Sequence, residues 1–431
     1  MTKDGLRAAA VEIDITPPVG VAMEGYTARQ GRSQGIHDPL RAQALLLEAG
    51  DRRLLFFSLD LLGISLEITE SLRLRLKDEL GLDPAGVMIA CSHTHAGPAG
   101  FLADVPGLQT APDPVLREML ERKLAGAALE ADARLAPARL ALGRGQVHGL
   151  GANRNDPEQG PFDSELILLR VDDIDGRPLA VIFIFGCHPT VLGHENLLLS
   201  AEFPGAARAA LRRIYPQTIF LFANGASGDI STRFTRREQT FREVERLGHI
   251  LAGSVIAGMN RAEPIHMSPL GAALRTLSLP LRRFPPPEDL QATIDDLAAR
   301  LEALKAQGAS HGEIRRIFTQ WQGAVGQAQM GEMLRGRETL KTHLQAFCIG
   351  PLAIVGFPGE PFTRLVLDMK RRSPTQATAV ISYCNDEKGY FPDRQAFDRQ
   401  TYEALISPYG PDVGAWLVDQ AVELIQEVFH A

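Results

Sequence analysis

Short apolar runs of strand length alternate along this chain with segments of helical spacing. Residues 87–91, 179–185, 218–223 and 352–357 are strongly apolar, and each run ends in a polar segment containing Gly or Pro. Residues 68–80, 113–133 and 203–213 instead show helical patterns. Uninterrupted apolar runs of this length are typical of buried strands, and such strands need helices to cover their sheets. We therefore predict a mixed α/β fold, with β-sheets flanked by helices.

Residues 285–338 have a different character from the rest of the chain. Pro285-Pro286-Pro287 ends one element, and residues 288–307 then carry leucines at helical spacing. Residues 308–312 interrupt this pattern, and residues 313–337 form a second long helical segment. The segment is predicted to be a helical hairpin inserted into a single domain that spans residues 1–431.

The composition excludes several classes of protein. The chain has 431 residues, 45% of them hydrophobic, and a net charge of −7 without a dense basic run, which argues against nucleic-acid binding. No apolar stretch has membrane length. The first residues lack the apolar core of a secretion signal, so we expect a cytoplasmic protein. Its four cysteines are widely spaced and are expected to be reduced, buried thiols: Cys91, Cys187, Cys348 and Cys384.

Two histidines follow the apolar run at residues 87–91, in the segment Ser92-His93-Thr94-His95. Residues two apart on a strand share one face, so His93 and His95 are expected to point into the same space. This arrangement puts two imidazoles near one metal ion, or one on the metal and one beside it. The alternative is a pair of histidines in a polar loop.

Polar segments at the ends of other predicted strands carry further candidate ligands. They contribute His188, Asp229 with Ser231, Glu360 and Tyr390. Loops at the carboxyl ends of strands converge in α/β proteins, which favours one shared site. Two histidines and a glutamate form a usual catalytic zinc set with one position open for water, and a tyrosine phenolate can fill a further position.

Each of these residues also has a purely structural interpretation. His188 beside a proline is able to cap a strand, and Glu360 to assist the start of the helix that follows. Tyr390 is compatible with core packing, and Ser231 with a helix N-cap. The recurrence of the same class of position at several strand ends favours a common site over four separate structural roles.

A series of short motifs, in order along the whole chain, resembles the neutral/alkaline (non-lysosomal) ceramidases, which are zinc-dependent amidases. The resemblance rests on Asp14-Ile-Thr-Pro-Pro18, Gly25-Tyr26, Ile36-His-Asp-Pro-Leu40, Ser92-His-Thr-His-Ala-Gly-Pro98, Asn153-Arg154, Phe185-Gly-Cys-His188, Asn224-Gly-Ala-Ser-Gly-Asp-Ile-Ser231, Gly359-Glu360, Gly389-Tyr390, Tyr402-Glu403 and Tyr409-Gly-Pro411.

The resemblance implies specific roles for these residues. The zinc ligands that it implies are His93, His188, Glu360 and Tyr390. It implies that His95 lies beside the metal, that Arg154 binds the substrate or transition state, and that Ser231 and Tyr402 belong to the active site. The expected reaction is hydrolysis of an N-acyl amide by water that bound Zn²⁺ activates.

Two departures from the family pattern bear on the substrate and the architecture. Thr232-Arg233-Phe234 stands where the family has Pro-Asn after the serine, so the wall of the substrate pocket is expected to differ. The resemblance also extends to about Ala431, so we expect no C-terminal immunoglobulin-like domain. Ceramide and smaller N-acyl amines are both candidate substrates, and an oligomer is compatible with the sequence.

Two alternatives to zinc-dependent hydrolysis stay open at this point. One is a serine-dependent esterase or amidase acting through Ser231, although this residue is not in a Gly-X-Ser-X-Gly elbow. The other is a metal- or lipid-binding module without catalytic activity.

Overall fold

Two β-sheets form the centre of the computed structural model, which describes residues 5–103, 111–266 and 270–429. The larger sheet has the strand order β11-β9-β8-β6-β1-β3-β4-β5, with β13 beside β6. The smaller sheet has the order β14-β15-β16-β18. The larger sheet contains β1 (Arg7–Asp14), β3 (Arg41–Ala49), β4 (Arg52–Leu59), β5 (Val87–Cys91), β6 (Ala136–Gln146), β8 (Glu165–Asp173), β9 (Pro178–Phe185), β11 (Ile219–Asn224) and β13 (Glu263–Ile265). The smaller one contains β14 (Leu270–Pro280), β15 (Thr339–Ile349), β16 (Leu352–Gly356) and β18 (Ala377–Ile381).

The two sheets pack face to face around a shared apolar core. Phe56 and Ile182 of the larger sheet lie in one cluster with Ile354 of the smaller sheet. The next residues along the same strands, Phe57 and Phe183, point to the opposite face of the larger sheet. Both faces of the sheet are therefore buried, which explains why its strands read as continuous apolar runs.

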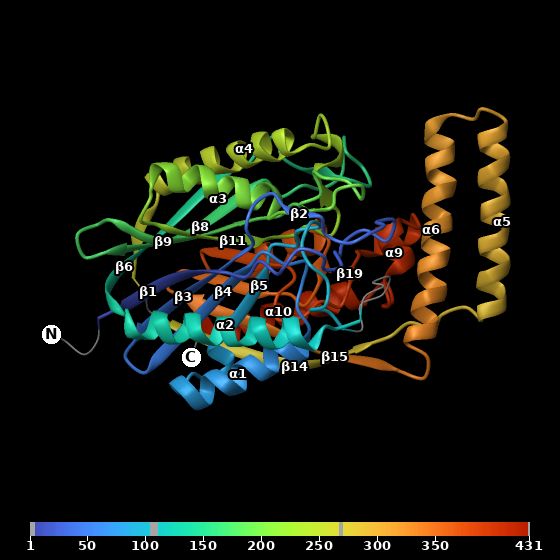
Figure 1. Ribbon diagram of the computed structural model, residues 1–431. Helices are drawn as coiled ribbons and strands as arrows, with labels where there is room; N and C mark the ends of the chain where they lie inside the picture. The colour runs from blue at the N-terminus through green and yellow to red at the C-terminus, as the bar shows by residue number, and fades with distance from the viewer. Residues whose placement is uncertain (1–4, 104–110, 267–269, 430–431) are drawn as a thin grey trace.

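Helices cover the outer face of each sheet (Figure 1), which confirms the predicted α/β class. On the larger sheet, α1 (Leu66–Leu80) and α2 (Pro114–Ala133) cover one half, and α3 (Glu202–Ile214) and α4 (Phe241–Asn260) cover the other. On the smaller sheet lie α7 (Thr363–Arg372) and α10 (Val413–Phe429). Helix α1 ends at Gly81, directly after the helical pattern of residues 68–80, because this glycine takes the left-handed conformation at φ 66°.

The predicted helical hairpin is present as α5 (Pro287–Ala306) and α6 (His311–Met333), which stand side by side at one end of the molecule (Figure 1). Leu297 and Leu301 of α5 pack against Ile317 of α6. A capping box between Ser310 and Glu313 starts the second helix. The hairpin thus has a small apolar core of its own, and α6 also contacts the short helix α9 (Tyr402–Ile406).

Several very short strand pairs lie beside the ends of the main strands. Strand β7 (Ala152–Asn153) pairs with β12 (Ile230–Ser231), and β17 (Glu360–Pro361) pairs in parallel with β19 (Tyr390–Phe391). The remaining short elements are β2 (Gly35–Ile36), β10 (Leu198–Leu199), α8 (Arg394–Asp398) and two 3₁₀ turns, η1 (Pro84–Gly86) and η2 (Thr232–Phe234). The region around residues 151–157, predicted to be a loop, therefore contains a two-residue strand.

Two further expectations concern the cysteines and the membrane-length helices. All four cysteines are buried and unpaired, as predicted. Within the described ranges, no helix combines the length and apolarity that crossing a bilayer requires.

Helix α3 begins at a buried acidic residue in an unusual conformation. Glu202 has a positive φ of 56°, and its Oε1 accepts a hydrogen bond of 2.8 Å from the backbone N–H of Leu192. Burial raises the pKa of Glu202 to about 7. The side chain therefore ties the start of α3 to the loop that follows β9.

The raised pKa of Glu202 predicts a specific pH dependence of stability. The folded protein binds this proton more tightly than the unfolded chain, so the stabilisation is lost as pH rises from 4.5 through 7. Between pH 5 and pH 8, the free energy of unfolding should fall by about 2 kcal/mol more in wild type than in Glu202→Gln. Urea unfolding at both pH values measures this difference. An equal change in the free energy of unfolding between the two pH values in both proteins would contradict it.

A second prediction concerns the interface between the two sheets. Ile354→Ala should lower the free energy of unfolding by about 2–5 kcal/mol, because Ile354 is fully buried and its truncation leaves a cavity. The matched control is Ile174→Ala in an exposed turn, expected to change stability by less than about 0.5 kcal/mol. Chemical denaturation compares the two, and similar losses would show that Ile354 is not part of a tightly packed interface.

Candidate metal centre

The candidate site lies where strands of both sheets end. His93 follows β5, His188 follows β9, and Glu360 follows β16. Backbone hydrogen bonds join these ends: the N–H of Cys91 donates to Tyr383 and that of Ser382 to Asn224. The predicted convergence of strand ends is therefore observed, and it brings ligands from the two sheets together.

His93 reaches the site by a backbone turn rather than by strand alternation. Strand β5 ends at Cys91, and His93 has a φ of 65°, so the prediction that the strand pleat aligns His93 with His95 was wrong in its reason. The Nδ1 of His93 donates to the carbonyl of Leu62 at 2.7 Å. Its ring stacks on Tyr383, with centroids 3.6 Å apart. These contacts direct its Nε2 toward Glu360, 3.9 Å from Oε1.

His188 is oriented in the same way. Its Nδ1 lies 2.6 Å from the carbonyl oxygen of Ser227 and 3.1 Å from that of Ile230. Because Nδ1 carries the proton for these contacts, Nε2 keeps a free lone pair. This Nε2 is 2.9 Å from Oε2 of Glu360, yet it has no partner in hydrogen-bond geometry among the described residues. A short distance without a hydrogen bond is what two ligands of one ion would show.

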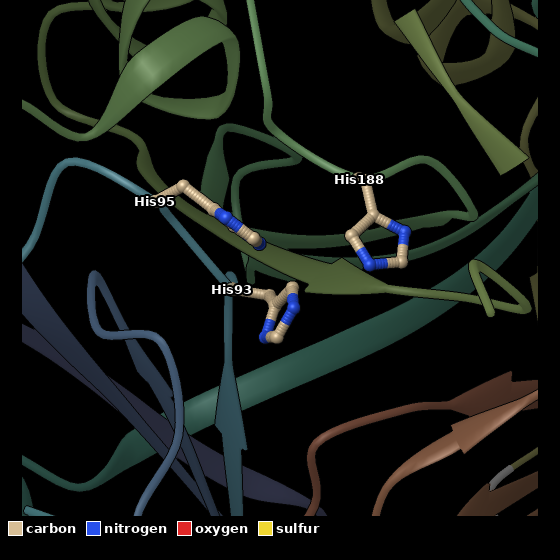
Figure 2. Close-up of side chains that lie close together, drawn as sticks. All are labelled: His93, His95 and His188. Carbon is tan, nitrogen blue, oxygen red and sulfur yellow. The ribbon is translucent and has the colours of Figure 1, made fainter. Parts of the chain in front are cut away.

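His95 completes a cluster of three imidazoles that face a common space (Figure 2). Ring nitrogens of His93, His95 and His188 lie within 4.8 Å of one another. Neither ring nitrogen of His95 is hydrogen-bonded to any described residue, although the ring is largely enclosed. His93 and His188 thus belong to two overlapping sets, one completed by His95 and the other by Glu360.

The chemistry of these groups fits a bound divalent cation. Burial holds the pKa of all three imidazoles well below the usual range, so they are neutral and able to donate lone pairs. Burial also raises the pKa of Glu360, and the nearby His93 opposes that rise. Ligands of a tetrahedral ion held at about 2.0 Å are separated by roughly 3.3 Å. The distances from 2.9 to 4.8 Å bracket that value.

Tyr390 and Arg154 form one side of the site. Tyr390 is the direct strand partner of Glu360 in the β17–β19 pair, and its ring centroid lies 6.4 Å from that of His188. The guanidinium carbon of Arg154 lies 5.4 Å from the Tyr390 ring centroid. Burial raises the pKa of Tyr390 and Arg154 opposes this effect, so a phenolate here needs additional positive charge.

Ser231 is buried beside His188, but its contacts are structural. The two residues form an isolated parallel bridge, and the Oγ of Ser231 accepts the N–H of Arg233 at 3.4 Å to cap η2. No histidine in the described part of the chain is hydrogen-bonded to this Oγ. The N-cap interpretation of Ser231 is therefore observed.

Tyr402 stands at the first position of α9, next to Glu403, and is half-buried. Arg154 opposes the effect of burial, which raises the pKa of Tyr402, so these two side chains share one electrostatic environment.

Asp229 is not one of the candidate metal ligands. Its carboxylate instead accepts hydrogen bonds from Thr363 at 2.9 Å and from Asn153 at 2.8 Å, and so ties three loops together.

Sequence reasoning missed Tyr383 as a member of the site. Its hydroxyl lies 2.8 Å from Oγ of Ser227 and donates to Oε2 of Glu360 at 3.2 Å, so it holds the carboxylate in place. Tyr383 follows β18 just as His93 follows β5, and that position was the available signal. The apolar pattern of residues 379–383 concealed it, because that pattern extends past the end of β18 at Ile381.

Comparison with known proteins gives a consistent family. A family model described as the N-terminal part of neutral/alkaline non-lysosomal ceramidases matches residues 8–236. Neutral ceramidase of Oryza sativa is 29% identical over 212 residues, which are 45% of this chain and 27% of that protein. Neutral ceramidase of Pseudomonas aeruginosa is 29% identical over 43% of this chain and 30% of its own length. These alignments thus span less than a third of either relative.

The fold also resembles solved structures over nearly its full length. The crystal structure of neutral ceramidase from Pseudomonas aeruginosa superposes with a TM-score of 0.81 and 21% identity, covering 99% of this chain and 75% of that one. A ceramidase complexed with C2 gives a TM-score of 0.78 at 19% identity. Because the family model matches more than half of the 431 residues, the chain belongs to the neutral/alkaline non-lysosomal ceramidase family.

Proposed function

We propose that this protein is a zinc-dependent hydrolase that cleaves an N-acyl amide with metal-activated water. One observation carries the proposal: the Nδ1 atoms of His93 and His188 are held by backbone carbonyls, which leaves both Nε2 atoms directed at Glu360. Two histidines and one carboxylate with a free position suit catalytic zinc. Family membership supports amide hydrolysis, and we propose zinc as the metal.

Each residue of the site would have a separate role in the reaction. His93, His188 and Glu360 would hold Zn²⁺, with Tyr390 placed beside Glu360 as a further ligand. Bound zinc lowers the pKa of water toward ~7 and polarises the amide carbonyl. His95 has an unpartnered ring nitrogen and would carry a proton to the leaving amine. The guanidinium of Arg154 would stabilise the charge that develops on the carbonyl oxygen.

The substrate class is proposed more broadly than ceramide. Relatives are named neutral ceramidases, which supports an N-acylated lipid amine. The residues after Ser231 depart from the family pattern, and Arg233 and Phe234 are both exposed in η2. Ser231 and Tyr402 would contact the polar groups of the substrate near that altered wall. Smaller N-acyl amines therefore belong in the same substrate screen as ceramide.

The serine-dependent alternative has weaker geometric support. A serine nucleophile needs a base within hydrogen-bond reach, whereas the Oγ of Ser231 accepts a hydrogen bond from the backbone N–H of Arg233. A non-catalytic module is the other alternative. The cluster of His93, His95 and His188 would serve metal binding alone equally well, so measured hydrolysis is what distinguishes the two functions.

The first test is metal content. Purified wild type should contain close to one zinc per chain by mass spectrometry, and Glu360→Gln should contain much less because a neutral amide is a poorer zinc ligand. Glu118→Gln, on the exposed surface of α2, is the matched control and should keep its zinc. Wild type without zinc, purified in the absence of chelator, would defeat the proposal.

The second test separates the two nucleophiles. With zinc-activated water, chelation should abolish hydrolysis of an N-acyl amide, and Ser231→Ala should slow it by about 10²-fold or less. A serine mechanism predicts the opposite pattern, with activity that survives chelation and disappears in Ser231→Ala. Covalent labelling of Ser231 by a serine-directed phosphonate would likewise favour that alternative.

A further inference from the structure

We infer that Glu403 is a positioning residue that holds Arg154 at the site, and that the α5–α6 hairpin fixes Glu403 through close packing of α6 on α9. The inference deepens the proposed function, on which it rests for the assignment of Arg154 to the substrate. It concerns residues outside the metal cluster and gives the hairpin a role in the reaction.

The contact between Glu403 and Arg154 is short and buried. Glu403 is 2% exposed, and its Oε1 lies 2.6 Å from the Nε of Arg154. Its second oxygen accepts a hydrogen bond of 3.1 Å from the Nδ2 of Asn155. Both carboxylate oxygens are thus engaged by neighbouring residues of one loop.

Backbone contacts restrain Arg154 from the other side. Its Nη2 donates to the carbonyl of Gly228 at 2.7 Å, and its backbone N–H donates to that of Asp229 at 2.8 Å. The ion pair with Glu403 at Nε lies outside hydrogen-bond geometry, but together with the hydrogen bond from Nη2 it restricts the plane of the guanidinium. Arg154 is consequently presented to Tyr390 and to the substrate position in one orientation.

Helix α9, which carries Glu403, depends on outside support. It has five residues, and so short a helix is marginal without tertiary packing. Arg282, which precedes the hairpin in the chain, donates to the carbonyls of Ala404 and Leu405 at the end of this helix. The position of α9 is therefore set partly by the hairpin and its flanking strand.

Two glycines of α6 permit the closest contacts with α9. A Cβ at Gly323 would lie 2.5 Å from Cδ1 of Leu405, and one at Gly326 would lie 2.7 Å from Cγ2 of Ile406. Both distances are shorter than real Cβ contacts, so an added methyl requires the facing side chain or α9 itself to shift. At Gly323 the Cβ of Leu405 would also lie 2.8 Å away, and no rotamer change relieves that contact. Leu405 is two residues from Glu403, so a shift of α9 is transmitted to the ion pair with Arg154.

The first experiment removes the charge of Glu403. Glu403→Gln should lower kcat on an N-acyl amide by about 10²-fold, as expected when a charge-stabilising group is displaced by about 1 Å, while zinc content stays at the wild-type level. Glu403→Asp should recover part of the loss. The Nε–H resonance of Arg154, assigned with Arg154→Lys, should show slow exchange of its proton with water in wild type and faster exchange in Glu403→Gln, because Glu403 covers this nitrogen.

The second experiment moves α9 from a distance. Gly326→Ala should lower kcat about tenfold with zinc retained, and Ile406→Ala in the same chain should restore it, because the clashing Cγ2 is gone and the Cβ of residue 406 lies 3.6 Å away. Ile406→Ala alone gives the baseline. The matched control is Gly312→Ala at the far end of α6, where a Cβ would meet nothing within 4 Å.

The outcomes separate this inference from the proposed function. If kcat of Glu403→Gln is within twofold of wild type, or the exchange rate of the Arg154 Nε proton is unchanged, Glu403 is not a positioning residue. If Gly326→Ala is fully active, or its loss is not restored by Ile406→Ala, the hairpin does not set α9. Failure of wild type to bind zinc or hydrolyse amides would instead overturn the proposed function, and the proton-exchange measurement would still test the ion pair.

Discussion

Two hydrogen bonds from imidazole Nδ1 atoms to backbone carbonyls determine what the rest of the site can do. They join His93 to Leu62 and His188 to Ser227, and they fix both the tautomer and the tilt of each ring. A carbonyl acceptor belongs to the backbone, so its position depends on the strands that anchor its loop. The orientation of the candidate ligands thus depends first on the sheets, and stacking on Tyr383 adds to it for His93.

These hydrogen bonds matter because the two sheets pack face to face and the candidate ligands follow strands of both. His93 and His188 follow strands of the larger sheet, whereas Glu360 follows β16 of the smaller one. The distance between the histidine nitrogens and the carboxylate therefore depends on the apolar core between the sheets, around residues such as Ile354. Tyr383 adds a local link, because it stacks on His93 and donates to Glu360 at the point where the sheets meet.

Much of the fold was predictable because its signals are local. Apolar run length, helical spacing and breaks at residues such as Gly81 depend on near neighbours, and the hairpin and the strand ends followed from them. The three clustered histidines were also predictable, since each stands just after a strand. The cytoplasmic location and the single-domain organisation stay predictions.

The missing parts of the site depend on contacts between distant segments. The pairing of Arg154 with Glu403 joins residues far apart in sequence, and no local pattern reports it. The sequence likewise gives no sign of the left-handed turn at His93, because glycine is the residue that usually marks such a conformation. Tyr383 was concealed by a strand boundary, which is the least certain feature of any pattern.

The backbone conformation around the site lowers the stability of the fold. His93, Tyr383 and Asn385 all have positive φ values between 54° and 65°, a region that most side chains disfavour. Each such residue sacrifices on the order of 1–3 kcal/mol of stability. Glycine would relax the backbone at residue 93 but would remove a candidate metal ligand. Stability and ligand geometry thus compete at this turn, and a member of the family that lost its metal would be free to become more stable there.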